Sequence, residues 1–358
     1  MAGQDVNFID VLKEKKALVW PEINKYLDEF LDFPKYCQVP EKYSNLKRFH
    51  QQITADYCLR QGKYFRPSLI LLTTAAMGYS EKKAVKTAAA MEICQNWILN
   101  HDDIEDDSQQ RRGKPCLHRQ VGTELAVNAG DALHILMWKV LKDNVEVVGE
   151  PTGLKIIEEF YRMLSRTAFG QTVEIKWNRD NKANLTINDI LLILESKTGY
   201  YTMAGPMRLG AILAGANNDQ LDKIYEFGKL IGFGFQIKDD LLDLTSDFQG
   251  RKKQQGNDIY EGKRTIMLIH LMKNIDKTGQ KKLISILDKN RKEKSKSEVD
   301  WVMGKMNEFG SIDYARKMME KFIDQADKYF DKELIFLNQQ PARRQLKAFI
   351  DLQKSRQY

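Results

Sequence analysis

The sequence predicts an all-α protein. Residues that favour helices, namely leucine, alanine, lysine, glutamate and methionine, dominate many windows of the 358-residue chain, and prolines number only eight. No stretch between turn residues alternates apolar and polar side chains with the period of two that a half-buried strand requires. We therefore expect a bundle of roughly ten helices forming a single domain over residues 1–358, with a division into two domains as the alternative.

Breaks in the helical pattern predict where the helices begin and end. The first helix is expected over residues 7–31, before Pro34 and Pro40, and a helix–turn–helix pattern follows from about 43 to 110. Its two breaks lie at 62–67 and 78–80, where Ser80 is the expected N-cap. Further helices are expected at about 122–142, 152–176, 187–213, 218–245, 262–290, 296–307, 311–329 and 341–354.

Charge and cysteine usage restrict the class of protein. The formal net charge of +7 indicates an anionic partner, which could be a nucleic acid, a membrane surface or a phosphorylated small molecule. Part of this excess lies in the run Lys289–Lys294, which we expect to be a solvated loop. The four cysteines are widely spaced, without the C-x-x-C pair or nearby histidine of a zinc site. With no signal-peptide pattern and no long apolar window, the expectation is a cytoplasmic protein without a stable membrane anchor.

Two D-D-x-x-D motifs are the most informative feature of the sequence. They consist of Asp102, Asp103 and Asp106, and of Asp239, Asp240 and Asp243. Positions i, i+1 and i+4 lie on one face of a helix, so each motif directs three carboxylates the same way. Such crowding is destabilising unless a cation compensates it, and helix carboxylates that leave coordination positions open are typical of Mg²⁺ sites. Both motifs continue stripes expected to face the interior, so they could face each other across a cavity of the bundle.

Basic residues accompany both acidic motifs. They are Lys63 and Arg66 before the first motif, Arg111 and Arg112 directly after it, and Lys253 and Lys263 after the second. Each pair alone is commonplace, but their alternation with the carboxylates is informative. A site with both features can hold two diphosphates, one through metal ions and the other through direct charge-assisted hydrogen bonds.

These motifs resemble those of the trans-polyprenyl diphosphate synthases, the family of farnesyl and geranylgeranyl diphosphate synthases. In order, they are G-K-x-x-R-P at 62–67, D-D-x-x-D followed by R-R-G, Gly170-Gln171, Lys197-Thr198, Phe235-Gln236, and D-D-x-x-D followed by K-x-x-G-x-D and G-K-x-T. The resemblance implies the isoprenoid synthase fold, with a central active-site cavity, and a homodimer. Its substrates would be isopentenyl diphosphate and an allylic diphosphate.

The same resemblance implies a role for each matching residue. Mg²⁺ ions, three per site, would be held on the allylic diphosphate by Asp102, Asp103, Asp106, Asp239 and Asp243, with Asp240 also in the catalytic set. That diphosphate would be contacted by Arg111, Lys197, Lys263 and Lys253. Isopentenyl diphosphate would be bound by Lys63, Arg66, Gln95 and Arg112. Many members have histidine where Gln95 stands, but farnesyl synthases of eukaryotic type often carry glutamine.

The implied reaction begins with loss of the allylic pyrophosphate, whose charge the Mg²⁺ ions and basic groups neutralise. The double bond of isopentenyl diphosphate then attacks the carbocation, and a proton leaves, with the pyrophosphate as the expected acceptor. Lys197, Thr198 and Gln236 would direct oxygen dipoles at the cation.

Product length is expected to depend on the side chains beneath the first acidic motif. Trp97 lies five residues before Asp102 and Ile98 lies four before it. By helical angle Ile98 lies more nearly below the aspartate, but an aromatic residue at the fifth position is a common floor in the family. We therefore expect geranylgeranyl diphosphate as the product, with farnesyl diphosphate as the alternative.

Other classes of protein fit the sequence less well. A terpene synthase shares the first motif but needs no isopentenyl diphosphate site such as Lys63 and Arg66. A non-catalytic subunit of a heteromeric synthase predicts an eroded acidic motif, and both motifs are intact. Binding of nucleic acid predicts basic residues among exposed aromatic ones, whereas here they lie beside carboxylates that repel phosphate.

Overall fold

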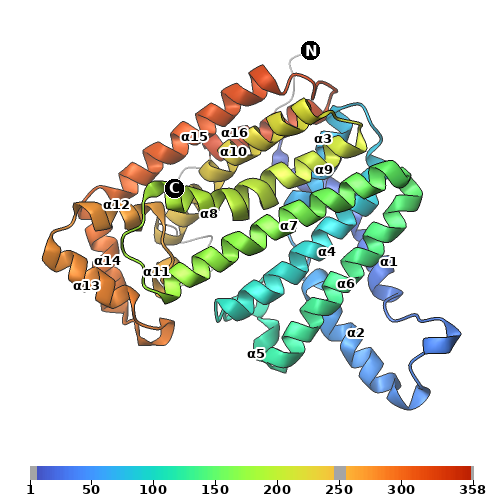
Figure 1. The fold of residues 1–358 in the computed structure, drawn as a ribbon, viewed down its shortest axis with the longest axis horizontal. Helices are drawn as coiled ribbons and strands as arrows, with labels where there is room; N and C mark the ends of the chain where they lie inside the picture. Colours follow the sequence, from blue (N-terminus) through green and yellow to red (C-terminus); the bar gives the residue numbers. More distant parts are fainter. Residues whose placement is uncertain (1–5, 246–254, 356–358) are drawn as a thin grey trace. The chain divides into compact units, whose positions relative to one another are not determined.

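The computed structural model describes residues 6–245 and 255–355, and helices dominate it (Figure 1). This confirms the all-α prediction. The helices are α1 Phe8–Asp28, α2 Ser44–Leu59, α3 Phe65–Ala76, α4 Glu81–Glu105, α5 Leu117–Val121, α6 Thr123–Val148, α7 Glu150–Arg179, α8 Ile187–Leu194, a π-helix Glu195–Ala204, α9 Gly205–Leu213, α10 Asn218–Thr245, α11 Asn257–Glu261, α12 Ile266–Asn274, α13 Lys277–Leu287, α14 Lys296–Glu308, α15 Ser311–Glu333 and α16 Ala342–Ser355.

The described residues divide into two compact units, which are treated separately below. The first contains the chain up to Glu159, with Pro206–Asn217 and Phe336–Ala348. The second contains Phe160–Gly205, most of the chain from Asn218 to Ile335, and the residues from Phe349 on. The single domain expected over residues 1–358 stays a prediction.

Helix α4 is central to the first unit. It packs most extensively against α6 and α3, and α4 and α6 run side by side in Figure 1. Its small residues Ala88, Ala89 and Ala90 are fully buried and allow the neighbouring helices to approach closely. The helix begins after Ser80, as expected, although the Ser80 side chain makes no capping hydrogen bond.

Helix α10 is central to the second unit, where it packs against α15 and the π-helix. Two of its glycines allow the backbones of α10 and the π-helix to pack closely. A Cβ on Gly232 would lie 2.5 Å from Gly199 Cα, and one on Gly228 would lie 2.5 Å from the Ala204 nitrogen. The π-helix carries Thr198 beside this contact, and π-helical segments are frequent at functional sites. The close packing brings Thr198 to α10 one turn before the second acidic motif.

Two local features differ from the sequence-based expectation. The helix expected over 262–290 is interrupted at Ile275, which is extended, because Asp276 caps a new helix by accepting a hydrogen bond from the Gly279 N–H at 2.7 Å. A short hairpin also follows α4: β1 Gln110–Arg111 pairs antiparallel with β2 Lys114–Pro115. Its turn residues Arg112 and Gly113 both have positive φ, of 53° and 78°, as a two-residue hairpin turn requires.

The run Lys289–Lys294 is only partly the solvated loop that we expected. Asn290, Lys292 and Glu293 are exposed, but Arg291 is half-buried and Lys294 is buried. A basic run is therefore not a sufficient sign of a solvated segment when its side chains reach backbone carbonyls nearby.

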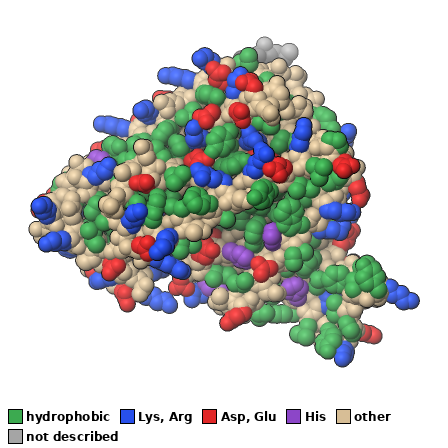
Figure 2. All heavy atoms as spheres, in the orientation of Figure 1, with side chains coloured by type: hydrophobic (Ala, Val, Ile, Leu, Met, Phe, Trp, Pro, Cys, Tyr) green, Lys and Arg blue, Asp and Glu red, His purple; other side chains and the backbone are tan. Residues whose placement is uncertain are grey.

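Basic and acidic side chains are interspersed over the face shown in Figure 2, with apolar side chains between them. Within the described residues, no helix combines the length and apolar character needed to cross a membrane.

Candidate active site

Both acidic motifs lie at the C-terminal ends of helices. Asp102 and Asp103 are in the last turn of α4, and Asp243 is in the last turn of α10; neither last turn contains a basic residue. The C-terminal end of a helix carries partial negative charge, so carboxylates there are destabilised twice, by one another and by the helix. A bound cation removes both penalties, and the donor set therefore fits Mg²⁺.

In the first motif, Asp103 turns inward. Its side chain is 0% exposed and accepts hydrogen bonds from Arg111 Nε at 3.0 Å to each oxygen and from Tyr57 Oη at 2.5 Å. Burial alone would lower the pKa of Arg111, but Asp103 outweighs it and raises that pKa. Burial, followed by the hydrogen bond to Asp103, raises the pKa of Tyr57. Asp103 is thus compensated within the chain.

Asp102 remains accessible. Its side chain is 29% exposed, and its Oδ2 lies 3.9 Å from Arg111 Nη2, too far for a hydrogen bond. Asp106 is half-buried at the C-cap of α4. The first motif therefore divides into one buried, paired carboxylate and two that a metal ion could reach.

A second basic group of the first unit surrounds Arg112. Its guanidinium donates from Nη1 to the Tyr57 carbonyl at 2.8 Å and to Asn96 Oδ1 at 2.9 Å, and Nη2 lies 3.9 Å from Glu92 Oε1. A Cβ on Gly62 would lie 2.6 Å from Arg112 Nη2, so a larger residue at this position would displace the guanidinium group. Glu92 is 3% exposed; burial raises its pKa to about 7, although Arg112 and Arg66 oppose the shift.

The other residues expected to bind isopentenyl diphosphate belong to the same unit. Lys63 is exposed, Arg66 is half-buried in the first turn of α3, and Gln95 is 8% exposed on α4. Within the described part of the chain, Gln95 Oε1 has no hydrogen-bond partner. A buried acceptor of this kind is costly, so Gln95 is suited to receive a polar group from a ligand.

Trp97 is held by histidines. Its ring stacks on His134 of α6, with centroids 4.2 Å apart and planes at 21°, and meets His101 edge-on at 6.1 Å. His134 is fixed in turn, because its Nε2 accepts a hydrogen bond from Trp138 Nε1 at 2.9 Å. Ile98 is half-buried beside Trp97 on α4. The structure thus gives the expected floor residue a rigid support that the sequence did not show.

The second motif is arranged differently. Asp239 is exposed, whereas Asp240 is 8% exposed and accepts a hydrogen bond from Gln236 Nε2 at 3.0 Å. Gln236 is oriented by Thr198, whose Oγ1 donates to Gln236 Oε1 at 2.8 Å. Burial raises the pKa of Asp240 to about 7, with Asp239 adding to the shift and the Gln236 hydrogen bond opposing it.

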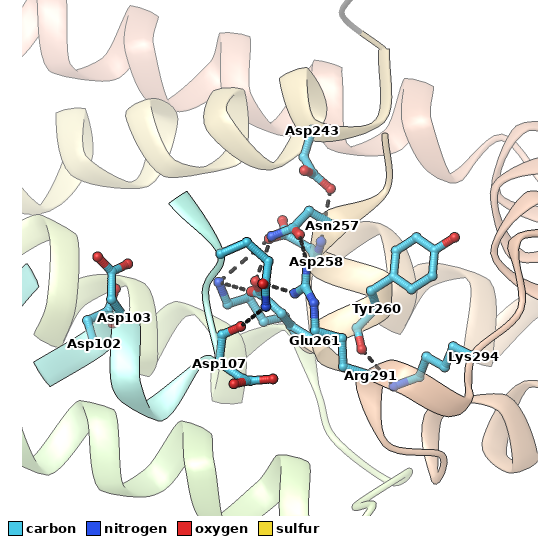
Figure 3. A network of polar contacts seen from close by, with 12 residues as sticks. Asp102, Asp103, Asp107, Asp243, Asn257, Asp258, Tyr260, Glu261, Arg291 and Lys294 are labelled. Atoms are coloured by element: carbon cyan, nitrogen blue, oxygen red, sulfur yellow. Dashed lines mark hydrogen bonds and ion pairs between the residues drawn. The ribbon is translucent and has the colours of Figure 1, made fainter. Parts of the chain in front are cut away.

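Asp243 joins α10 to the short helix α11. Its Oδ2 accepts a hydrogen bond from the Asp258 backbone N–H at 3.0 Å (Figure 3). Burial raises the pKa of Asp243, and it raises that of Asp258 strongly. The second unit therefore gathers three buried or half-buried carboxylates with raised pKa values, Asp240, Asp243 and Asp258.

Two lysines lie among these acidic groups. Lys197 forms an ion pair with Glu174, and Lys263 lies 2.6 Å from Glu261 Oε2 and 3.7 Å from Asp258 Oδ1. Burial opposes ionisation of Glu174, but Lys197 and Lys263 outweigh it and lower its pKa. Asp240, Asp258, Lys263 and Thr265 line one small pocket. Lys253, the remaining expected ligand, lies outside the described residues.

Sequence reasoning missed the acidic and aromatic partners of these groups. Tyr57 contacts Asp103 across 46 residues of sequence, and no local pattern indicates this contact. Glu174 carried a usable signal, because it lies one helical turn after Gly170 and Gln171 and so shares their face.

Within residues 6–245 and 255–355, no group of three His, Cys, Asp or Glu side chains is close enough to enclose a metal ion. Mg²⁺ characteristically uses one or two carboxylates, with water and substrate phosphate oxygens completing its coordination. The accessible Asp102 and Asp239 suit this mode of binding.

Comparisons with known proteins agree on one family. The family model described as polyprenyl synthetase matches residues 48–306. The chain is 30% identical to the geranylgeranyl diphosphate synthase of Methanosarcina mazei over 83% of its length and 86% of that protein. It is 28% identical to the geranylfarnesyl diphosphate synthase of Natronomonas pharaonis, over 83% and 87% of the two chains.

Solved structures show the same fold. The crystal structure of geranylgeranyl pyrophosphate synthetase from Pyrococcus horikoshii superposes with a TM-score of 0.82 at 27% identity, covering 98% of both chains. The helical architecture, the two acidic motifs and the matching family model thus agree. The chain belongs to the polyprenyl synthetase family and is a prenyltransferase of the polyprenyl diphosphate synthase kind.

Proposed function

We propose that this enzyme condenses isopentenyl diphosphate with allylic diphosphates and that its main product is geranylgeranyl diphosphate. The observation that carries this proposal is the position of both acidic motifs, at helix C-termini without basic residues in the last turn. Each motif keeps an accessible carboxylate, Asp102 or Asp239, for a cation. Two similar proteins named geranylgeranyl synthases support the product.

Mg²⁺, with three ions per site, would be held by Asp102, Asp106, Asp239 and Asp243, while Asp103 adds charge and fixes Arg111. The metal supplies electrostatic stabilisation of the departing pyrophosphate. Arg111, Lys197, Lys253 and Lys263 would bind that pyrophosphate directly. The acidic partners of Arg111, Lys197 and Lys263, such as Glu174 for Lys197, keep these three cations in place before the substrate arrives.

The remaining residues would bind isopentenyl diphosphate or stabilise the allylic carbocation. Lys63, Arg66 and Arg112 would bind the diphosphate of isopentenyl diphosphate, with Gln95 Oε1 accepting from a bound water or the protonated substrate. Thr198 and Gln236, which are hydrogen-bonded to each other, and the Lys197 backbone carbonyl would direct oxygen dipoles at the carbocation.

The proposed floor for the growing chain is Trp97, supported by its stack on His134. The rigid stack favours one product length, and Ile98 extends the floor along α4. Geranylfarnesyl diphosphate, the product named for the Natronomonas pharaonis relative, and farnesyl diphosphate are the neighbouring outcomes.

The test is incubation of purified protein with Mg²⁺, labelled isopentenyl diphosphate and each of dimethylallyl, geranyl and farnesyl diphosphate, followed by chromatography of the dephosphorylated products. We expect a C20 alcohol from the wild type and longer alcohols from Trp97→Ala and, to a smaller extent, His134→Ala. Leu125→Ala is the matched control, because Leu125 is exposed on the same helix as His134. A C15 alcohol from the wild type would move the assignment to farnesyl diphosphate synthase.

We also propose a homodimer. Helix α6 exposes Val127, Ile135 and Trp138 on one face, with Ile135 65% exposed, and apolar side chains grouped in this way are typical of an interface. Light scattering of the wild type and of Ile135→Lys tests this proposal. We expect twice the chain mass for the wild type and a shift towards the monomer for the variant.

A further inference from the structure

Helix α11 and the turn that follows it are held by the basic run Lys289–Lys294. Lys294 is 6% exposed, and its Nζ donates to the Tyr260 carbonyl at 3.0 Å (Figure 3). It also donates to the Lys289 carbonyl at 2.7 Å. A buried ammonium group that donates to two carbonyls fixes the two backbone segments that carry them relative to each other. The position of Lys263, three residues after Tyr260, therefore depends on this run.

Arg291 acts on the same turn through a shared carboxylate. Glu261, whose side chain is 7% exposed, lies between two cations. Its Oε1 accepts hydrogen bonds from Arg291 Nη1 at 2.8 Å and Asn257 Nδ2 at 2.6 Å, and its Oε2 lies 2.6 Å from Lys263 Nζ. Arg291 Nη2 also donates to Asn257 Oδ1 at 2.5 Å. Arg291 thus fixes Glu261 through one carboxylate oxygen, while Lys263 lies beside the other.

This geometry decides how strongly Glu261 retains Lys263. A buried carboxylate with a single cation partner holds it tightly, because both charges lose their water. When a second cation and an amide also bind the carboxylate, its electrostatic attraction for the first cation is weaker. With Arg291 in place, Lys263 is oriented by Glu261 and Asp258, but its ammonium group can still form an ion pair with an anionic ligand.

We infer that Arg291 is a positioning residue for the diphosphate site, and that it acts through Glu261 by leaving Lys263 available to the allylic diphosphate. This inference rests on the proposed role of Lys263. Lys294 supports the same arrangement by fixing the backbone of α11. Neither residue belongs to the motifs that carry the family resemblance.

A double-mutant cycle of Arg291→Met and Lys263→Met tests the inference, with KM measured separately for geranyl diphosphate and isopentenyl diphosphate. Arg291→Met is expected to raise KM for geranyl diphosphate roughly tenfold, the size of one charge-assisted contact, and to leave KM for isopentenyl diphosphate unchanged. In the Lys263→Met background the same change should add almost nothing. Arg291→Lys should restore part of the loss, and Lys292→Met, an exposed neighbour, is the matched control.

Each outcome decides a different point. Equal effects of Arg291→Met in both backgrounds, or an effect on kcat alone, would show a merely structural role and overturn the inference while the proposed function stands. No effect of Lys263→Met on either KM would remove the role proposed for Lys263 and the inference with it. Absence of product from every primer would instead contradict the proposed function.

Discussion

The two acidic motifs have the same sequence pattern but different charge compensation. In the first, the inward aspartate, Asp103, receives three hydrogen bonds from Arg111, two of them from Nε at 3.0 Å and one from Nη2, and one from Tyr57. In the second, the inward aspartate, Asp240, receives one neutral hydrogen bond from Gln236, and burial raises its pKa to about 7. One motif is thus balanced largely by the protein, whereas the other needs a cation or a proton.

Because of this difference, the inward aspartates of two motifs with the same sequence pattern have different roles. Asp103 orders the hairpin that carries Arg111 and Arg112, because its partner lies on that hairpin. Asp240 lies in a pocket with Lys263 and Asp258, and Lys263 offsets only part of the burial that raises the pKa of Asp240. We therefore expect the first motif to tolerate loss of metal better than the second.

The largest expected effect concerns the accessible aspartate of each motif. Asp102→Asn and Asp239→Asn should each lower kcat/KM by about a thousandfold, because each removes a carboxylate proposed to hold Mg²⁺ on the leaving group. Incorporation of labelled isopentenyl diphosphate at saturating Mg²⁺ measures this. Glu105→Gln, which removes an exposed charge next to the first motif, is the control and should retain wild-type activity. Near wild-type activity of Asp239→Asn would contradict a metal role for the second motif.

The next effect contrasts the two inward aspartates. Asp103→Asn should destabilise the Mg²⁺-free protein by about 3 kcal/mol, because it removes the buried carboxylate that is hydrogen-bonded to Arg111. Asp240→Asn should lower the free energy of unfolding much less, or raise it, because the substitution removes a poorly compensated buried charge. Urea unfolding with chelator at pH 8 compares them. Equal losses for both variants would show that the two motifs are compensated alike.

The pH dependence sharpens the same contrast. The pKa of Asp240 is higher in the folded protein, about 7, than in the unfolded chain, so the folded state binds more protons between pH 4 and 7. The Asp240 contribution to stability is therefore present at low pH and is lost as pH rises through about 7. The stability of Asp240→Asn relative to the wild type should increase over this range, as measured by thermal unfolding without Mg²⁺. A constant difference would mean that Asp240 ionises normally.

The smallest effect concerns Thr198. Thr198→Val removes the hydroxyl that orients Gln236, so we expect a loss of about 1 kcal/mol in transition-state stabilisation, or roughly fivefold in kcat. Thr198→Ser keeps the hydroxyl and should remain close to the wild type. If both variants behave alike, the methyl group rather than the hydrogen bond accounts for the effect.

Much of this arrangement could be predicted from sequence. Helical spacing predicted that both motifs continue interior-facing stripes, and the structure buries one aspartate of each motif, Asp103 and Asp240, while Asp102 and Asp239 remain accessible. Adjacent residues on a helix differ by about 100° in direction, so spacing alone cannot say which aspartate of a D-D pair turns inward. The compensation depends on long-range contacts such as Tyr57 with Asp103, which no local pattern encodes.

The residues that hold Trp97 and helix α11 in place could not be predicted from the sequence either. His134 beneath Trp97 comes from a neighbouring helix, and the basic run that holds α11 looks like an ordinary solvated loop. Burial of a lysine is decided by carbonyls within its reach, which are known only once the chain is folded.

The most direct test of the account is calorimetric titration of Mg²⁺ into the wild type, Asp102→Asn and Asp239→Asn in the presence of inorganic pyrophosphate, which binds without reacting. The account predicts Mg²⁺-dependent pyrophosphate binding by the wild type and a loss of bound metal in each variant. Unchanged metal stoichiometry in both variants would contradict the claim that the two acidic motifs hold the cations of the reaction.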